Sequence, residues 1–245
     1  MIFNLFKSKP TLKELIPNGY IDIHSHILPG IDDGAKNIEE SLELISEMKK
    51  LGFSKIIGTP HIYQGLFDNT NLSIKKSYNK LYNKTQDGIK INYAAEYLLD
   101  NTIISKSKNS KLLTIKDNYV LVELSFFSQP LNLNEIIFEA TINGYILVLA
   151  HPERYRYFFD NMNDLTNLKK KGILFQANLL SLTDYYGKDV NRFLKKLMKL
   201  EMIDFFGSDF HNMNQIRYFK NYKKGISNSK VETIRKALEN SQIFS

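Results

Sequence analysis

The chain has 245 residues, a formal net charge of +7, 43% hydrophobic residues and no cysteine. This length fits one large domain with a full apolar core. The absence of cysteine excludes disulfides, cysteine-ligated zinc or iron–sulfur sites, and the cysteine nucleophile that one whole class of phosphatases uses.

The positive charge reflects a general richness in lysine, because the lysines are spread along the chain and form no basic stripe interleaved with aromatic residues. We therefore expect no nucleic-acid partner. No apolar run reaches the ~18 residues of a membrane span. The first ten residues also lack the apolar core of a signal peptide, so the sequence predicts a cytoplasmic protein.

Short apolar runs, typical of buried strands, alternate along the chain with segments of helical spacing. The seven predicted strands are residues 20–24, 55–59, 91–95, 119–124, 146–150, 173–177 and 203–206. The predicted helices are residues 37–51, 72–84, 133–143, 162–171, 188–200 and 230–240, and a polar crossover over 100–113 is less regular. The first helix is the clearest, because Ile38, Leu42, Ile45 and Met48 share one face and Gly52 follows its end.

This alternation predicts an α/β protein with a parallel sheet. The strands are apolar throughout, as expected for strands that are buried on both faces. Polar residues at the first and last strand ends meet more easily in a closed barrel than in an open sheet. We therefore expect a single-domain (β/α)7 TIM-like barrel over residues 19–245, preceded by an N-terminal extension over residues 1–18.

All five histidines lie at the ends of apolar runs, where histidine, the commonest metal ligand, is well placed to join a shared site. They are His24, His26, His61, His151 and His211. Residues two apart in an extended chain point the same way, so the pair in HSH can grip one ion.

Several carboxylates also lie at the ends of apolar runs. Glu96, Glu123 and Asp209 lie at strand ends, and a turn carries Asp32 and Asp33. A carboxylate in a buried strand, such as Glu123, is costly unless it is paired or binds metal. Each feature alone has an ordinary explanation, but together they predict a multinuclear metal site. Imidazole and carboxylate ligands without sulfur favour manganese, iron or zinc.

The motifs IDIHSHILPGIDDGA, TPH, EY, VEL, LAHPERY and SDFHN occur in this order between about residues 19 and 211. They resemble the PHP (polymerase and histidinol phosphatase) superfamily, and most closely its bacterial manganese-dependent tyrosine phosphatases of capsule and exopolysaccharide biosynthesis. Two departures, Ala35 after DDG and Phe210 in SDFH, leave every ligand in place. The resemblance implies a distorted seven-stranded barrel, the PHP fold, that holds three metals, of which Mn²⁺ is expected and iron or zinc possible alternatives.

The resemblance also implies a division of the ligands among the metals. The first metal would be held by His24, His26, Glu96 and Asp209. The second would be held by Glu96 as a bridge, Glu123 and His151. The third would be held by Asp33, His61 and His211; the choice of Asp33 over Asp32 comes from the family. Arg154 would contact the substrate phosphate together with Arg217, and the catalytic residues would be Arg154, Asp209 and His211.

The implied reaction is hydrolysis of a phosphomonoester by a hydroxide that bridges the metals. The expected substrate is a phosphotyrosine protein, namely a cognate bacterial tyrosine kinase of polysaccharide export. A phosphatase for histidinol phosphate or another small molecule is the main alternative, and a PHP-type nuclease or a non-catalytic scaffold fits less well. The loop 62–71, with Tyr63 and Phe67, either forms part of the substrate wall or packs on itself.

Overall fold

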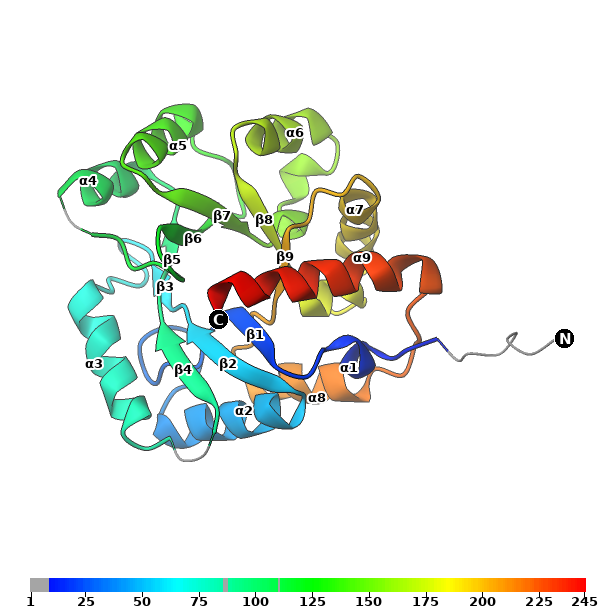
Figure 1. The fold of residues 1–245 in the computed structure, drawn as a ribbon. Helices are drawn as coiled ribbons and strands as arrows, with labels where there is room; N and C mark the ends of the chain where they lie inside the picture. The colour runs from blue at the N-terminus through cyan, green and yellow to red at the C-terminus, as the bar shows by residue number, and fades with distance from the viewer. Residues whose placement is uncertain (1–8, 86–87, 110) are drawn as a thin grey trace, which may run out of the picture.

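The computed structural model describes residues 9–85, 88–109 and 111–245. Its strands are parallel and most are followed by a helix (Figure 1). The strands are β1 (Tyr20–Ser25), β2 (Phe53–Gly58), β3 (His61–Ile62), β4 (Lys90–Tyr93), β5 (Glu96–Leu98), β6 (Tyr119–Glu123), β7 (Ile146–Ala150), β8 (Leu174–Asn178) and β9 (Phe205–Gly207).

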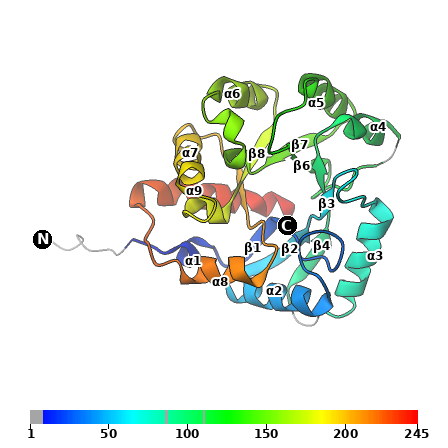
Figure 2. The same ribbon diagram turned by 180° about the vertical axis from the view of Figure 1, so that it is seen from behind.

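The α-helices lie outside the strands (Figures 1 and 2). They are α1 (Leu12–Leu15), α2 (Ile38–Lys50), α3 (Asn71–Tyr82), α4 (Asn101–Asn109), α5 (Leu133–Ile142), α6 (Met162–Lys170), α7 (Lys188–Lys199), α8 (Met213–Asn221) and α9 (Asn228–Glu239). The six predicted helices are confirmed to within about two residues at each end, and the polar crossover forms α4. Helices α1 and α8 were not expected.

The strands form two sheets, in the orders β1-β2-β4 and β3-β5-β6-β7-β8-β9. The second and third predicted strands correspond to β2 and β4, and each is followed after a short break by a further strand, β3 or β5, that lies outside the predicted bounds. The backbone of Pro60, which has no N–H to donate, marks the first of these breaks. Hydrogen bonds still cross the breaks, from Ala94 N to Gly58 O and from Glu96 N to Pro60 O. The seven predicted strands are confirmed as β1, β2, β4, β6, β7, β8 and β9, whereas β3 and β5 were not expected.

The first and last strands meet just beyond β9. A parallel bridge joins Ser25 to Phe210, and it is flanked by hydrogen bonds from His26 N to Phe210 O and from Asp209 N to His24 O. These bonds bring the first and last sequence motifs side by side. The predicted α/β class and distorted barrel are confirmed. The barrel consists of two sheets, which meet where the end of β1 lies beside the segment that follows β9.

Two hydrophobic clusters fill the molecule. The larger cluster lies between strands and helices, and Leu12 and Leu15 of α1 are buried in it, so the described part of the segment before β1 packs with the barrel. Residues 1–8 of the expected extension lie outside the described residues. The smaller cluster contains residues of both sheets and Phe244, which belongs to a C-terminal 3-10 helix. The ring of Phe244 contacts the rings of Tyr119 and Phe205.

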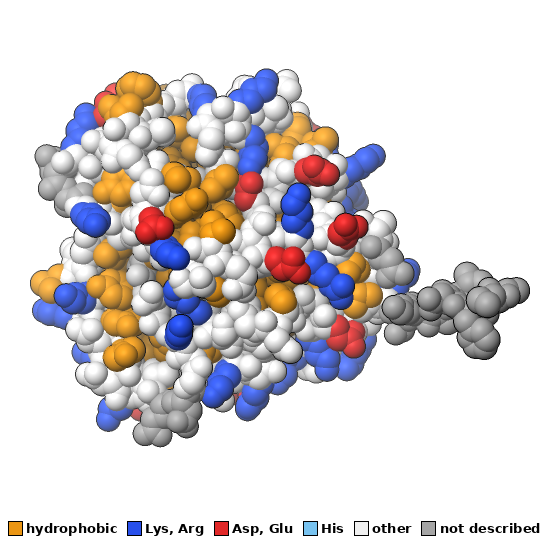
Figure 3. Space-filling model, in the orientation of Figure 1, with side chains coloured by type: hydrophobic (Ala, Val, Ile, Leu, Met, Phe, Trp, Pro, Cys, Tyr) orange, Lys and Arg blue, Asp and Glu red, His pale blue; other side chains and the backbone are white. Residues whose placement is uncertain are grey.

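The surface mixes charges of both signs. On the face seen in Figure 1, lysine and arginine side chains are interspersed with acidic, polar and apolar ones (Figure 3). Within the described part of the chain, no helix combines the length and apolar character that a membrane span requires.

Candidate metal centre

The nine predicted metal ligands lie together at the carboxyl ends of the strands. Their nitrogen and oxygen atoms fall into four overlapping groups, within each of which all the atoms lie less than 4.8 Å apart. The groups are His24, His26 and Glu96; His24, His151 and Asp209; His61, Glu96 and Glu123; and His26, Asp33, His61 and His211. Residues nearly 190 positions apart in the chain meet because parallel strands end at one edge.

The HSH segment provides the innermost part of the centre. The Nε2 atoms of His24 and His26 lie 3.2 Å apart. The carboxylate oxygen Oε2 of Glu96 lies 3.2 and 3.5 Å from these two nitrogens, and Oδ1 of Asp209 lies 3.2 and 3.3 Å from them. All four side chains are buried, so two nitrogens and two oxygens converge on one small, water-poor space.

The second nitrogen of each of these rings is hydrogen-bonded away from the centre. His24 Nδ1 lies 2.6 Å from Oε1 of Gln176, and His26 Nδ1 lies 2.8 Å from Oδ2 of Asp32. Because these partners are acceptors, they place the proton on Nδ1 and leave the lone pair of Nε2 facing its neighbours, which is the arrangement found around metal-bound histidines. Asp32 thus supports a candidate ligand from behind.

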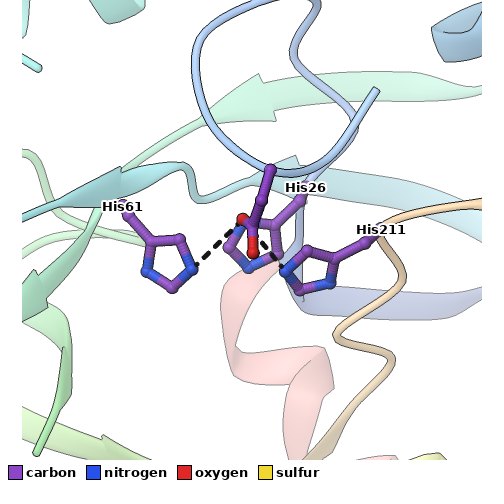
Figure 4. Close-up of side chains that lie close together, drawn as sticks. His26, His61 and His211 are labelled. Atoms are coloured by element: carbon purple, nitrogen blue, oxygen red, sulfur yellow. Dashed lines mark ion pairs between the residues drawn. The ribbon is translucent and has the colours of Figure 1, made fainter. Parts of the chain in front are cut away.

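Asp33 lies between two histidines at the mouth of the centre. Its Oδ1 atom is 3.5 Å from Nε2 of His61 and 3.4 Å from Nε2 of His211 (Figure 4). The His211 ring also stacks on that of His26, with centroids 3.8 Å apart. Of the two acidic residues in the DDG turn, Asp33 therefore directs its carboxylate towards His61 and His211.

Glu96 and Glu123 connect the inner and outer parts. Oε1 of Glu123 lies 2.8 Å from Nδ1 of His61, and Oε1 of Glu96 lies 3.1 Å from Nε2 of His151. Nδ1 of His61 lies close enough to Glu123 for an ion pair but not at an angle that makes a hydrogen bond. Among the described residues, Nδ1 of His151 has no hydrogen-bond partner either. The two oxygens of Glu96 face different histidines.

The carboxylates create a strongly negative potential at the centre. Although burial lowers the pKa of His24, the charges of Glu96 and Asp209 raise it to about 10, so a proton occupies Nε2 unless a metal ion takes its place. Burial lowers the pKa of His151 to about 4, so this ring is neutral near pH 7 and can offer a lone pair. Burial and the neighbouring charge of Glu96 raise the pKa of Glu123. The field therefore favours cations.

Two candidate ligands occupy a strained backbone conformation. His151 and Asp209 have φ angles of 36° and 53°, in the left-handed region that residues other than glycine rarely adopt. Such strain costs on the order of 1–3 kcal/mol and persists where the surrounding structure enforces it, often at functional sites. Here it turns the chain sharply after β7 and β9, which lets both side chains reach the centre.

A pocket of about 300 Å³ opens onto the centre. The guanidinium of Arg154 lies within it, 4.8 Å from the ring centroid of Phe126 and 4.4 Å from that of Tyr186, and its Nη1 is 3.0 Å from Oδ2 of Asp209. Arg217 instead lies exposed on α8, where it hydrogen-bonds Asn214, and it does not line this pocket.

Several supporting residues escaped the sequence analysis, because neutral amides and single aromatic residues carry little signal there. They are Phe126, Gln176, Asn178 and Tyr186. In the loop 62–71, the ring of Phe67 stacks on His61 with centroids 5.2 Å apart, and Tyr63 bridges Phe67. Neither residue lines the pocket, so this loop contacts a candidate ligand rather than forming the pocket wall.

The donor set fits divalent metal ions. The Nε2 atoms of His24 and His26 face each other at 3.2 Å while their Nδ1 atoms are hydrogen-bonded elsewhere, so a cation, whether a proton or a metal ion, must lie between them to offset the repulsion of their lone pairs. Five imidazoles and four carboxylates provide the nitrogen and oxygen ligands that manganese, iron and zinc accept.

Comparisons with known proteins agree with this geometry. The family model "Capsular polysaccharide synthesis, CpsB/CapC" matches residues 20–233. The tyrosine-protein phosphatase YwqE of Bacillus subtilis is 32% identical over 197 residues, which cover 79% of this chain and 78% of YwqE. The tyrosine-protein phosphatase CpsB of Streptococcus pneumoniae is 28% identical over 204 residues, which cover 79% of this chain and 84% of CpsB.

Solved structures extend the likeness to three dimensions. The crystal structures of YwqE from Bacillus subtilis and CpsB from Streptococcus pneumoniae are described as those of unique metal-dependent tyrosine phosphatases, and the match has a TM-score of 0.74 at 28% identity, covering 90% of this chain and 94% of that one. A histidinol phosphate phosphatase from Lactococcus lactis, at 16% identity and a TM-score of 0.53 over 82% of this chain and 91% of that one, shares the fold. From these matches, this chain belongs to the CpsB/CapC family of capsular polysaccharide synthesis.

Proposed function

We propose that this protein is a metal-dependent phosphomonoesterase that dephosphorylates phosphotyrosine in proteins. The observation that carries the proposal is the convergence of five histidines and four carboxylates on one centre, onto which a pocket that contains Arg154 opens. Its relatives YwqE and CpsB are tyrosine-protein phosphatases, which supports the same activity here. The lack of cysteine is consistent with a phosphatase that needs no thiolate.

The proposed metal ligands are His24, His26, Asp33, His61, Glu96, Glu123, His151, Asp209 and His211. When bound there, divalent ions supply positive charge that polarises a phosphoryl oxygen and lowers the pKa of a water molecule. We propose Mn²⁺ as the native ion, since nitrogen and oxygen ligands without sulfur suit it.

Arg154 is proposed to bind the substrate phosphate. Its planar guanidinium can donate two parallel hydrogen bonds to phosphate oxygens. The rings of Phe126 and Tyr186 on either side restrict its motion, and its ion pair with Asp209 directs it toward the metal ligands. The exposed ring of Phe126 offers an apolar surface beside this arginine for the aromatic ring of a phosphotyrosine.

The basicity of the leaving group determines how much proton transfer the site must provide. A tyrosine phenol has a pKa of about 10, so its phenolate leaves with less proton assistance than an alkoxide requires. We assign the transfer of any proton to Asp209 and His211, which line the pocket next to Arg154. We propose that this protein acts in the cytoplasm, and that its partner is a cognate bacterial tyrosine kinase of polysaccharide export.

A side-by-side phosphate-release assay tests the substrate. Purified protein is given a phosphotyrosyl peptide or histidinol phosphate, with Mn²⁺ and in parallel with EDTA. We expect release from the peptide that the chelator abolishes. Preference for histidinol phosphate would move the protein to small-molecule metabolism, and release from neither would refute the proposed phosphatase activity.

A pair of matched variants tests the site. Glu123→Gln removes one carboxylate charge from the centre, whereas Glu139→Gln removes one from a partly buried ion pair with Lys108 outside the centre. We expect the first variant to lose about 100-fold or more in kcat/KM, as removal of one transition-state electrostatic contact does. The second variant should keep its activity. Equal activity of the two variants would show that Glu123 has no role in turnover.

A further inference from the structure

Two amide side chains at the end of β8 connect His24 to Asp209. Oε1 of Gln176 lies 2.6 Å from Nδ1 of His24. Nε2 of the same amide donates to Oδ1 of Asn178 at 3.1 Å, and Nδ2 of Asn178 donates to Oδ2 of Asp209 at 2.5 Å. All four residues are buried, so water does not compete for these bonds.

The direction of this chain of hydrogen bonds is determined at its charged end. An ionised carboxylate only accepts hydrogen bonds, so Asn178 must turn its NH₂ group toward Asp209. Its carbonyl oxygen then faces Gln176, which must donate with its own NH₂ group. The carbonyl oxygen of Gln176 is left for His24, whose Nδ1 must carry the proton. Rotating either amide by half a turn would bring two acceptors together at one of the short contacts.

We propose that Gln176 and Asn178 form a relay through which Asp209 sets the tautomer of His24. These amides are positioning residues: the relay presents the lone pair of His24 Nε2 and Oδ1 of Asp209 to the same space, where they lie 3.2 Å apart. The inference rests on the proposed metal centre, since both end residues are proposed ligands.

The neighbouring histidine is supported in a different way. His26 Nδ1 bonds directly to the carboxylate of Asp32, so its tautomer needs no relay. A neutral amide at His24 achieves the same orientation without adding a further negative charge beside Glu96 and Asp209.

The surroundings keep the relay in one geometry. Gln176 packs against Gly207, which leaves no room for a side chain. A Cβ atom added to Gly207 would lie 2.9 Å from Nε2 of Gln176 and 2.8 Å from Cβ of His24. The backbone N–H of Asn178 donates to Oε1 of Glu153 at 2.9 Å. Arg154 shares Oδ2 of Asp209 with Asn178, so this oxygen keeps one donor if Arg154 swings toward a phosphate.

Mn²⁺ affinity, measured by calorimetry on the whole chain without substrate, tests the relay. We expect Asn178→Ala to weaken binding about 10- to 100-fold, the usual effect of losing an outer-shell partner. The informative variant is Gln176→Glu combined with Asn178→Ala. Its carboxylate accepts directly from His24, as Asp32 does from His26, so we expect affinity to return to within about threefold of wild type.

The matched control is Asn191→Ala. Asn191 is also buried and donates one side-chain hydrogen bond, to the backbone oxygen of Ser181, but it touches no proposed ligand. This variant should lose stability and keep its Mn²⁺ affinity. Gln176→Leu interrupts the relay at its other end and should reproduce the loss of affinity if Asn178→Ala does not fold.

The outcomes separate the relay from the centre that it serves. If wild-type protein binds no Mn²⁺, the proposed metal centre fails. If wild type binds Mn²⁺ and Asn178→Ala binds it equally well, the centre stands and the relay is refuted. A double variant that binds more weakly than Asn178→Ala would show that the amides serve only as structural links, and would also refute the tautomer relay.

Discussion

Gly34, the last residue of the DDG turn, touches the backbone of His26 so closely that no side chain fits between them. A Cβ atom added to Gly34 would lie 2.1 Å from the carbonyl oxygen of His26 and 2.5 Å from its Cβ. Cβ contacts shorter than 3.0 Å essentially never occur, so Gly34→Ala requires a relative shift of at least 3.0 − 2.1 = 0.9 Å. The groups that must yield are the main chain and Cβ of a proposed metal ligand.

The expected loss follows from this distance. Functional groups must be held to about 0.5 Å, and a displacement of 1 Å costs about 100-fold in rate. This factor corresponds to about 2.7 kcal/mol of transition-state stabilisation. Overpacking should also lower the free energy of unfolding by about 1–3 kcal/mol. We therefore expect Gly34→Ala to fold at 25 °C with at least about 100-fold lower kcat/KM.

The assay is hydrolysis of a phosphotyrosyl peptide with Mn²⁺, together with thermal unfolding followed by circular dichroism. Gly144→Ala is the control, because its Cβ meets nothing within 4 Å and only its φ of +85° is unfavourable. That variant should lose about 1–2 kcal/mol of stability and keep its activity. If Gly34→Ala retained activity within threefold of wild type, the close contact would have no bearing on the centre.

Three further predictions concern stability and metal dependence. Asp22→Ala should lower the free energy of unfolding in urea by about 2–4 kcal/mol. The reason is that it leaves the buried N–H and hydroxyl of Ser208, which donate to Asp22 at 2.8 and 2.5 Å, without an acceptor. Asp22→Asn keeps an acceptor and should lose less stability, and equal losses in the two variants would contradict this account. Hydrogen bonds from Lys220 and Lys50 lower the pKa of Glu47 from 4.5 to about 2, so Glu47→Gln should cost up to about 1 kcal/mol at pH 7. Because the folded-state pKa is depressed, that difference should shrink as pH falls from 4.5 towards 2, and a difference unchanged in this window would refute the assigned charge pair. Mn²⁺ in excess should raise the midpoint of thermal unfolding of EDTA-treated protein, and an unchanged midpoint would count against binding to the folded state.

Much of the site was predictable because of where its residues fall in the chain. Histidines and carboxylates at the ends of apolar runs come together whenever those runs are parallel strands, since parallel strands end at one edge. The division of the second and third strands was less predictable. Ile91 to Ala95 reads as one apolar run, but β4 ends at Tyr93 and the chain joins the second sheet only from Glu96 onwards.

Contacts between elements were not predictable in the same way. Gln176 and Asn178 carry no charge and give no metal-ligand signal, so their link between His24 and Asp209 is visible only as distances between β1, β8 and the segment after β9. The aromatic pair around Arg154 likewise comes from two distant loops.

The sequence by itself determined the α/β alternation, the candidate metal ligands and their order, because hydrophobic period and residue chemistry are local properties. The tertiary structure decided which nitrogen of His24 and of His26 faces the centre, that Asp33 faces His61 and His211 while Asp32 supports His26, and that Arg217 lies outside the pocket. These features depend on hydrogen bonds of about 3 Å between residues far apart in the chain, and such distances exist only once the strands have assembled.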